Sequence, residues 1–212
     1  MENSGFDYII IGGGSAGCTL AARLTESGKN TVLLLEAGGK ADGLLVKMPA
    51  GVGELIKNQN VHNWGFETEP QKNCNNRKMF WPRGKGLGGS SSINAMRYVR
   101  GHAGDYDHWA QMGLKGWDYA SVLPFFKKSE NNESGGDEFH GSGGPLQVSN
   151  GHSKAELFGV FIKAGVAAGY PYTDDFNGKS QEGVGPYQMT INDGERWSTA
   201  AAFLRPALSR PN

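Results

Sequence analysis

The sequence predicts an α/β fold that opens with a β-α-β unit and continues into a mixed α+β region. Two short apolar runs, FDYIII at 6–11 and NTVLLLEAGG at 30–39, predict strands buried on both faces. The segment between them becomes helical in pattern from Ser15 onward. Because the connections are short, we expect the two strands to be parallel and linked by a right-handed crossover.

The helix of this unit is predicted by one apolar face and a stop signal. The face consists of Ala16, Leu20, Ala21 and Leu24. Gly28 stands where a C-terminal cap belongs, and the second strand then runs to Glu36.

The rest of the chain is rich in loops and carries weaker signals. Strand character is found at 63–68 and 183–193, and the polar stretch 131–145 predicts a mobile connection. Residues 197–204 predict a helix with Ser198 as its N-cap. Further helical patterns occur at 91–99, 104–112, 119–129 and 155–168.

The composition excludes several classes of protein. Lys plus Arg equals Asp plus Glu at 21 each, which argues against a nucleic-acid binder and against an acidic tail protein. Two cysteines, Cys18 and Cys74, are too few for a disulfide framework. The chain shows no signal peptide, and no run approaches the roughly 18 apolar residues of a membrane helix. We expect a cytoplasmic protein, with peripheral contact to the inner membrane left open.

The first glycine-rich loop, IGGGSAG at 11–17, lies between the first strand and the helix. Gly12 permits the tight turn, Gly14 lets backbone amides reach a pyrophosphate, and Gly17 lets the helix pack on the strand. Glu36 follows Gly14 by 22 residues, where an acidic side chain accepts hydrogen bonds from a ribose. The loop therefore predicts a dinucleotide site in a Rossmann-like fold. This pattern disfavours NADP and leaves NAD and FAD open.

A second glycine-rich loop, PRGKGLGGSSSINAM, occupies 82–96. It lacks the GK[ST] ending of a P-loop. Gly88 and Gly89 offer free backbone, and Arg83 and Lys85 add positive charge, so the loop predicts a second anion cradle. A flexible linker is disfavoured because ordered, apolar sequence flanks the loop on both sides.

At this loop the chain resembles a known family. The stretch GKGLGGSSSINAMRYVRG at 84–101, with Asp107 beyond it, is similar to the N-terminal signature of the glucose–methanol–choline (GMC) oxidoreductases. The likeness is greatest to bacterial choline-dehydrogenase-like, FAD-dependent alcohol dehydrogenases. Supporting stretches run along essentially the whole chain, at 63–71, 100–110, 143–145, 174–178 and 194–204.

The resemblance implies that both loops bind one FAD. The pyrophosphate would be held by Gly12, Gly14, Ser15 and Ala16. Glu36 would bind the adenosine ribose, and Ala37 and Trp64 would lie near the cofactor. The second loop would supply the phosphate and ribityl path and then pass the flavin ring, through Arg83, Gly88, Gly89, Ser90, Asn94, Ala95 and Met96.

Two positions refine this expectation. Some family members attach FAD covalently through a histidine at the position of Ile93, so we expect a non-covalent, dissociable FAD. Aryl-alcohol relatives have a tyrosine at the position of Ala95, which disfavours an aromatic substrate. The resemblance thus implies oxidation of a primary alcohol, aliphatic or choline-like, to the aldehyde by hydride transfer to flavin. It further implies a quinone or another carrier, rather than oxygen, as electron acceptor.

A catalytic base is not identified, and no metal site is expected. Oxidation of an alcohol needs a group that takes the hydroxyl proton. The candidates have no evident partners and are expected to be solvated or structural: His62, His102, His108, His140 and His152. In the family, the base lies near the end of a much longer chain.

The resemblance also implies a division of the chain. Residues 1–150 would form the FAD-binding region with both loops, and residues 151–212 would begin a substrate-binding or cap region. We expect the first two-fifths of such an enzyme, with an incomplete sheet that exposes apolar faces. The 212-residue product would then be unstable or bind FAD weakly, and it would turn over no alcohol because the catalytic base is absent. The alternatives are a truncated, non-catalytic FAD-binding fragment or interaction module, and an NAD-dependent Rossmann protein, which the second loop disfavours.

Overall fold

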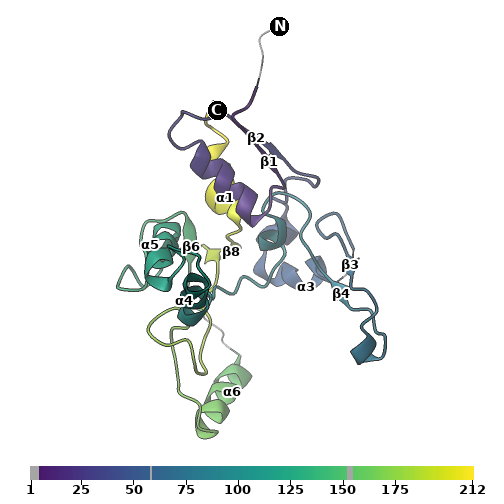
Figure 1. Ribbon diagram of the computed structural model, residues 1–212. Coiled ribbons are helices and arrows are strands. Elements are labelled where there is room, and N and C mark those ends of the chain that lie inside the picture. The colour runs from purple at the N-terminus through teal and green to yellow at the C-terminus, as the bar shows by residue number, and fades with distance from the viewer. Residues whose placement is uncertain (1–4, 58, 152–154) are drawn as a thin grey trace. The chain divides into compact units, whose positions relative to one another are not determined.

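A computed structural model describes residues 5–57, 59–151 and 155–212 (Figure 1). The chain forms two compact units. The first comprises the described residues up to Met96 together with Asp193–Asn212, and the second comprises Arg97–Asn192. The division expected at residue 150 separates a cofactor-binding region from a substrate-binding region. The two compact units do not test that division, so it stays a prediction.

The first unit opens with the predicted β-α-β arrangement. Strand β1 (Tyr8–Ile11) pairs in parallel with β2 (Val32–Leu35), and helix α1 (Ser15–Leu24) connects them. Gly28 has a φ of +71° and donates its amide to the carbonyl of Thr25 at 3.1 Å. The chain therefore leaves α1 through a glycine, as predicted.

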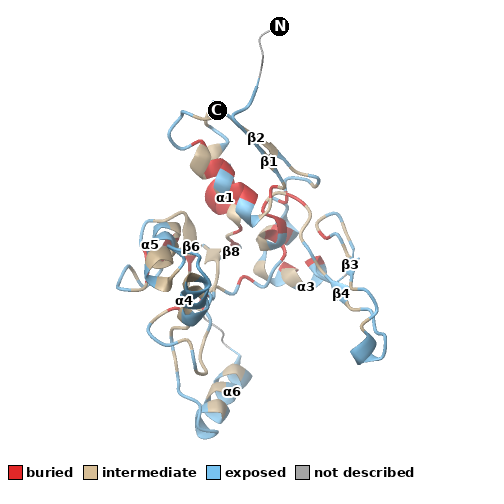
Figure 2. Cartoon of the chain, viewed as in Figure 1, coloured by how far each residue is buried: buried red, intermediate tan, exposed pale blue. Residues whose placement is uncertain are grey.

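The two strands are not buried on both faces, so that prediction is wrong for the described chain. Ile9 is 61% exposed and Ile11 is 87% exposed. Figure 2 shows β1 largely in the pale blue of exposed residues. Only the other side of the sheet packs on a core, in which Ile10, Val32 and Leu34 meet α1. The exposed side agrees with the expectation that a two-stranded sheet leaves apolar faces uncovered.

The last residues of the chain complete this core. Ala200–Leu204 form a π-helical turn that is wholly buried, and α7 (Arg205–Ala207) follows. This segment, yellow in Figure 1, packs beside α1. The predicted cap is present, because the amide of Ala201 donates to Ser198 Oγ at 3.3 Å. Strand β8 (Glu195–Arg196) precedes the turn.

Short elements make up the middle of the first unit. These are α2 (Leu44–Lys47), a 3₁₀ turn (Pro49–Gly51), α3 (Val52–Leu55), a 3₁₀ turn (Lys72–Cys74), and the antiparallel strands β3 (Phe66–Glu67) and β4 (Phe80–Trp81). A second core cluster consists of Ala41, Val46, Leu55 and Ile93.

The helix predicted at 91–99 is not formed. A 3₁₀ turn covers Gly89–Ser92 and does not continue into a helix. Met96 has a φ of +60°, which no right-handed helix contains. The serine hydroxyls explain the difference. Ser91 Oγ donates to the carbonyl of Gly88 at 2.6 Å, and Ser92 Oγ donates to the carbonyl of Leu87 at 2.8 Å. Such local bonds compete with helix formation.

The second unit contains the three other predicted helices within one residue of their expected bounds. They are α4 (Ala103–Gln111), α5 (Tyr119–Ser129) and α6 (Glu156–Ala167). Strand β5 (Glu130–Asn132) pairs in parallel with β6 (Leu146–Val148). Of the strand predicted at 183–193, only β7 (Ile191–Asn192) forms. Across the described ranges, no helix has the length and apolar character needed to cross a membrane.

Candidate functional site

Both glycine-rich loops border one open hollow in the first unit. Its volume is about 550 Å³, and its lining is Ile11, Gly12, Gly14, Leu35, Glu36, Ala37, Trp64, Gly84 and Gly89. The lining combines the end of β1, the start of α1, the end of β2 and the second loop. Six of the residues predicted to bind a cofactor therefore lie around the same space, although the two loops are far apart in sequence.

The first loop presents a helix N-terminus to this hollow. Gly12 has a φ of +99°, and a Cβ added at Gly17 would lie 1.9 Å from the Gly12 carbonyl oxygen. The first helical bond runs from the amide of Cys18 to the carbonyl of Gly14 at 2.9 Å. The amides of Ser15 and Ala16 precede that bond and have no partner within the helix. The start of α1 is thus suited to a negative group.

The second loop lies directly against the first. The amide of Gly88 donates to the carbonyl of Gly13 at 2.7 Å. A Cβ on Gly89 would lie 2.8 Å from Gly14 Cα, and Gly89 has a φ of +51°. Only glycine fits this close backbone contact without displacing one loop from the other.

The side chain of Glu36 joins the two loops. One carboxylate oxygen, Oε2, accepts the amide of Gly13 at 2.7 Å. The other, Oε1, accepts the amides of Gly38 at 2.8 Å and Gly86 at 2.9 Å. A carboxylate offers about four acceptor sites, so the three amides leave one for a hydroxyl group. The sequence indicated a ligand contact here, but it gave no signal for this bridging role.

Cationic and aromatic side chains lie near the hollow. Lys85 Nζ lies 4.6 Å from the ring centroid of Trp64, and the Trp64 ring stacks on Phe66 with centroids 5.8 Å apart. Arg83 is not in the lining. Its guanidinium lies over the Trp81 ring at 5.3 Å and donates to the carbonyl of Pro82 at 2.8 Å.

Four other predicted residues lie further along the second loop, outside the lining of this hollow. Ser90, Asn94 and Ala95 are exposed, whereas Met96 is buried. Ser90 Oγ accepts the amide of Gly84 at 3.1 Å, and Asn94 Oδ1 accepts the amide of Met96 at 3.0 Å. These bonds hold the non-helical course of the loop.

The histidines differ in their surroundings. His102 caps α4 by accepting the amide of Gly104 at 3.1 Å, and His108 is exposed on the same helix. His62 lies before the second loop, with its Nδ1 buried and without a partner among the described residues. His152 lies outside the described residues.

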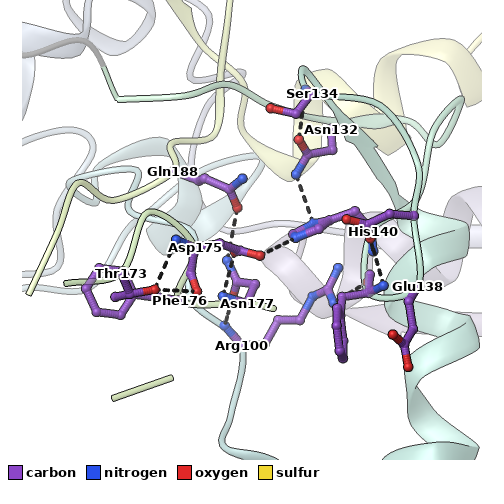
Figure 3. Close-up of polar contacts among 12 residues, drawn as sticks. Arg100, Asn132, Ser134, Glu138, His140, Thr173, Asp175, Phe176, Asn177 and Gln188 are labelled. Atoms are coloured by element: carbon purple, nitrogen blue, oxygen red, sulfur yellow. Dashed lines mark hydrogen bonds and ion pairs between the residues drawn. The ribbon is translucent and has the colours of Figure 1, made fainter. Parts of the chain in front are cut away.

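His140 corrects one expectation, because it has partners. The stretch 131–145 around it contains the end of β5 and several hydrogen bonds near the ring. Its Nδ1 lies 3.0 Å from Glu130 Oε1, and its Nε2 lies 2.9 Å from Asp175 Oδ2. Arg100 Nη2 reaches Glu130 Oε2 at 2.7 Å, and Glu130 is fully buried. Figure 3 shows the imidazole between Asp175 and Asn132 in the second unit.

This network is built from charges rather than from a free base. Hydrogen bonds to Asp175 and then to Glu130 raise the pKa of His140 to about 9, so the ring is an imidazolium at neutral pH. Burial opposes ionisation of Glu130, but bonds from His140, the Gly141 amide and Arg100 lower its pKa. The carboxylates stand 10 and 35 residues away from His140 in sequence, and this separation hid the network. The described residues contain no cluster of His, Cys, Asp or Glu suited to a metal ion.

Comparisons with known proteins agree with this arrangement. A family profile described as GMC oxidoreductase matches residues 6–212. An oxygen-dependent choline dehydrogenase from Brucella suis biovar 1 is 50% identical over 206 residues, which cover 97% of this chain and 37% of the relative. The chain thus spans little more than a third of that relative's length.

Solved structures are similar over nearly the whole chain. Pyridoxine 4-oxidase from Mesorbium loti superposes with a TM-score of 0.92 at 37% identity, covering 98% of this chain and 41% of that one. An FAD-dependent oxidoreductase from Chaetomium thermophilum gives a TM-score of 0.84 at 31% identity, covering 98% and 37%. The fold, the two glycine loops and these matches together establish that the chain belongs to the GMC oxidoreductase family.

Proposed function

We propose that this chain forms the FAD-binding part of an enzyme that oxidises a primary alcohol to the aldehyde. The observation that carries the proposal is the convergence of both glycine loops and Glu36 on one hollow. A single ligand placed there would touch the start of α1, the end of β2 and the second loop. FAD has the matching parts in one molecule, namely a pyrophosphate, a ribose and an extended ribityl chain.

The residues present fit such a ligand. The amides of Ser15 and Ala16 at the start of α1 suit the pyrophosphate, and a Cβ on Gly12 would point into open space, which leaves room for a ligand. Glu36 retains an acceptor site for a ribose hydroxyl, with Ala37 and Trp64 beside it. The second loop would continue along the ribityl chain and flavin ring through Gly88, Gly89, Ser90, Asn94, Ala95 and Met96, with Arg83 adding charge nearby.

Bound FAD would supply the hydride acceptor for the alcohol carbon, while the protein supplies binding and orientation. A separate group must take the hydroxyl proton. None of the four described histidines lies in the lining of the hollow, and His140 is already charged at neutral pH. We therefore propose that these four histidines do not act as the base.

The substrate proposed is an aliphatic or choline-like alcohol. The choline dehydrogenase name of the 50% identical relative supports it, as does the small Ala95 beside the expected ring position. For the acceptor we propose a quinone or another carrier, although the same relative is called oxygen-dependent, so the two acceptors need direct comparison. The proposed location is the cytoplasm, with the face of the inner membrane as the alternative.

A second candidate is a non-catalytic FAD-binding or interaction module. The exposed apolar face of the β1–β2 sheet favours it, because such a face is suited to contact with another protein surface.

The test is a flavin spectrum of the purified protein. One sample is then denatured, and a separate native sample receives choline or a simple primary alcohol under anaerobic conditions. The proposal predicts a yellow protein whose flavin is released on denaturation. In the longer enzyme of which this chain is proposed to be the FAD-binding part, bleaching by the alcohol would support the enzyme, whereas retained colour would support the module. A colourless protein that takes up no added FAD would refute both, and flavin that stays attached to denatured chain would refute non-covalent binding.

A further inference from the structure

Arg196 is a buried arginine in the first unit that ties together three segments distant in sequence. It is 3% exposed. Its Nε donates to the carbonyl of Val46 at 2.9 Å, just before the end of α2. Its Nη1 donates to the backbone carbonyl of Asn94 at 2.5 Å and to Asn94 Oδ1 at 3.0 Å, with the carbonyl of Ser91 at 3.4 Å. A single side chain thus holds the end of the second glycine loop through several hydrogen bonds.

The charge of Arg196 is held by carbonyl groups alone. Among the described residues it forms no ion pair, and its Nη2 is buried without a partner. Burial lowers the pKa of the guanidinium to about 10, so it remains protonated at neutral pH. An unpaired buried charge is costly, which argues that the planar fork serves a positional purpose at this place.

Thr199 forms a second tie between the same segment and the same loop. Its amide donates to Ser91 Oγ at 3.0 Å, and its Oγ1 lies 2.9 Å from that oxygen. Ser91 Oγ in turn donates to the carbonyl of Gly88 at 2.6 Å. Because the one proton of Ser91 is used on Gly88, the hydroxyl of Thr199 is the donor to Ser91.

These ties act on a backbone that needs outside support. Gly88, Gly89 and Met96 all have positive φ, at 89°, 51° and 60°. Glycine adopts such angles freely, whereas for Met96 this conformation is costly and persists only where the surroundings over-determine it. Gly88 also donates to Gly13, and Gly89 abuts Gly14, so a shift of the second loop would alter the lining of the hollow.

We propose that Arg196 is a positioning residue of the cofactor hollow, which holds Ser91 and Asn94 so that Gly88 and Gly89 stay against the first loop. Thr199 assists it through the Ser91 hydroxyl. The identity of the ligand as FAD rests on the proposed function, whereas the ordering of the loop does not.

The test compares Arg196→Met, Arg196→Lys and Thr199→Val with the exposed Arg205→Lys as control. FAD is titrated into flavin-free protein, the visible circular dichroism of the bound flavin is recorded, and amide hydrogen exchange is followed over 88–96. Loss of bonds from a charged donor should weaken FAD binding by roughly tenfold or more in Arg196→Met. Lysine keeps the charge without the fork, so Arg196→Lys should fall between Arg196→Met and wild type.

Exchange over 88–96 should quicken in all three variants and not in the control, while exchange in α4 and α5 stays unchanged. Unchanged exchange over 88–96, or unchanged FAD affinity and flavin dichroism in both Arg196 variants, would overturn the inference. Should Arg196→Met fail to fold, Arg196→Lys and Thr199→Val decide the question. If the wild type takes up no FAD, the proposed function fails, and the exchange measurement in flavin-free protein still tests the positioning role.

Discussion

Several side chains form hydrogen bonds between distant segments of the chain that sequence patterns do not reveal. Glu36 was predicted from its place after β2, and it does border the hollow. Two of its three amide contacts, however, are made to Gly13 and Gly86, one in each loop, and depend on how the chain folds back. The same holds for Arg196 and His140, whose partners lie far away in sequence. Local spacing can identify the residue type a site needs, but it cannot identify contacts made across 35 to 150 residues.

Replacement of Glu36 by glutamine tests the bridge between the loops. The glutamine amide group keeps one acceptor oxygen, and its NH₂ would face backbone donors. We expect a loss of about 1–3 kcal/mol in the free energy of unfolding, together with weaker FAD binding. Chemical denaturation measures the first effect. Glu26→Gln is the matched control, because Glu26 is exposed and pairs only with Arg23 on the surface. Equal stability of the two variants would contradict the bridging role.

The His140 network predicts a defined pH dependence of stability. The pKa of His140 is raised from 6.5 to about 9 in the folded chain, so its stabilising effect is full below pH 6.5 and is lost as the pH rises through about 9. Asp137 lies on the same loop, and Arg100, Glu130 and Asp175 complete the charges around the ring.

Denaturation curves taken across this pH range should show a steady loss of stability in the wild type and a flatter profile in His140→Gln. His108→Gln, at an exposed site on α4, should keep the wild-type profile. If His140→Gln retained the wild-type slope, the charged pairing of His140 would be refuted.

Among the elements, the regular ones were predictable and the irregular ones were not. Helices α4, α5 and α6 and the β-α-β unit follow hydrophobic periodicity, so the sequence indicated them closely. The helix expected at 91–99 failed because serine hydroxyls bond back to the loop backbone. The second loop is therefore a turn whose course is set by its glycines and its contacts.

The contact between the loops can be tested at one glycine. In Gly89→Ala, a Cβ would lie 2.8 Å from Gly14 Cα, so the two loops should separate and FAD affinity should fall. Gly28→Ala is the matched control, since Gly28 also has positive φ but faces open space. The positive φ costs both variants about 1 kcal/mol in the free energy of unfolding. Any further loss of stability in Gly89→Ala measures the clash. Thermal denaturation and FAD titration measure the two effects, and similar losses in both variants would contradict the predicted contact.

One apolar face of the β1–β2 sheet is exposed in the described chain. Ile9 and Ile11 are exposed on β1, and Leu35 is 47% exposed on β2. Such a surface favours association. The sequence predicted two strands and the exposure of an incomplete sheet. It also predicted burial of both faces, which is wrong, because apolar runs alone do not reveal which neighbouring strands are present.

A pair of substitutions separates the two sides of this sheet. Ile9→Thr should lower self-association and dye binding with little change in stability, because Ile9 is mostly exposed. Ile10→Thr should destabilise the first unit, because Ile10 packs on the core beside α1. Size-exclusion chromatography and denaturation distinguish the outcomes. Greater destabilisation by Ile9→Thr than by Ile10→Thr would refute this assignment of faces.

Two glycine loops that are distant in sequence are proposed to bind one FAD. The most direct measurement is the number of flavins bound per chain, determined for the wild type and for one variant in each loop, Gly14→Ala and Gly89→Ala. We predict one flavin per chain in the wild type and a loss of that flavin in either variant. Two flavins per chain, or a flavin whose binding depends on only one of the loops, would contradict it.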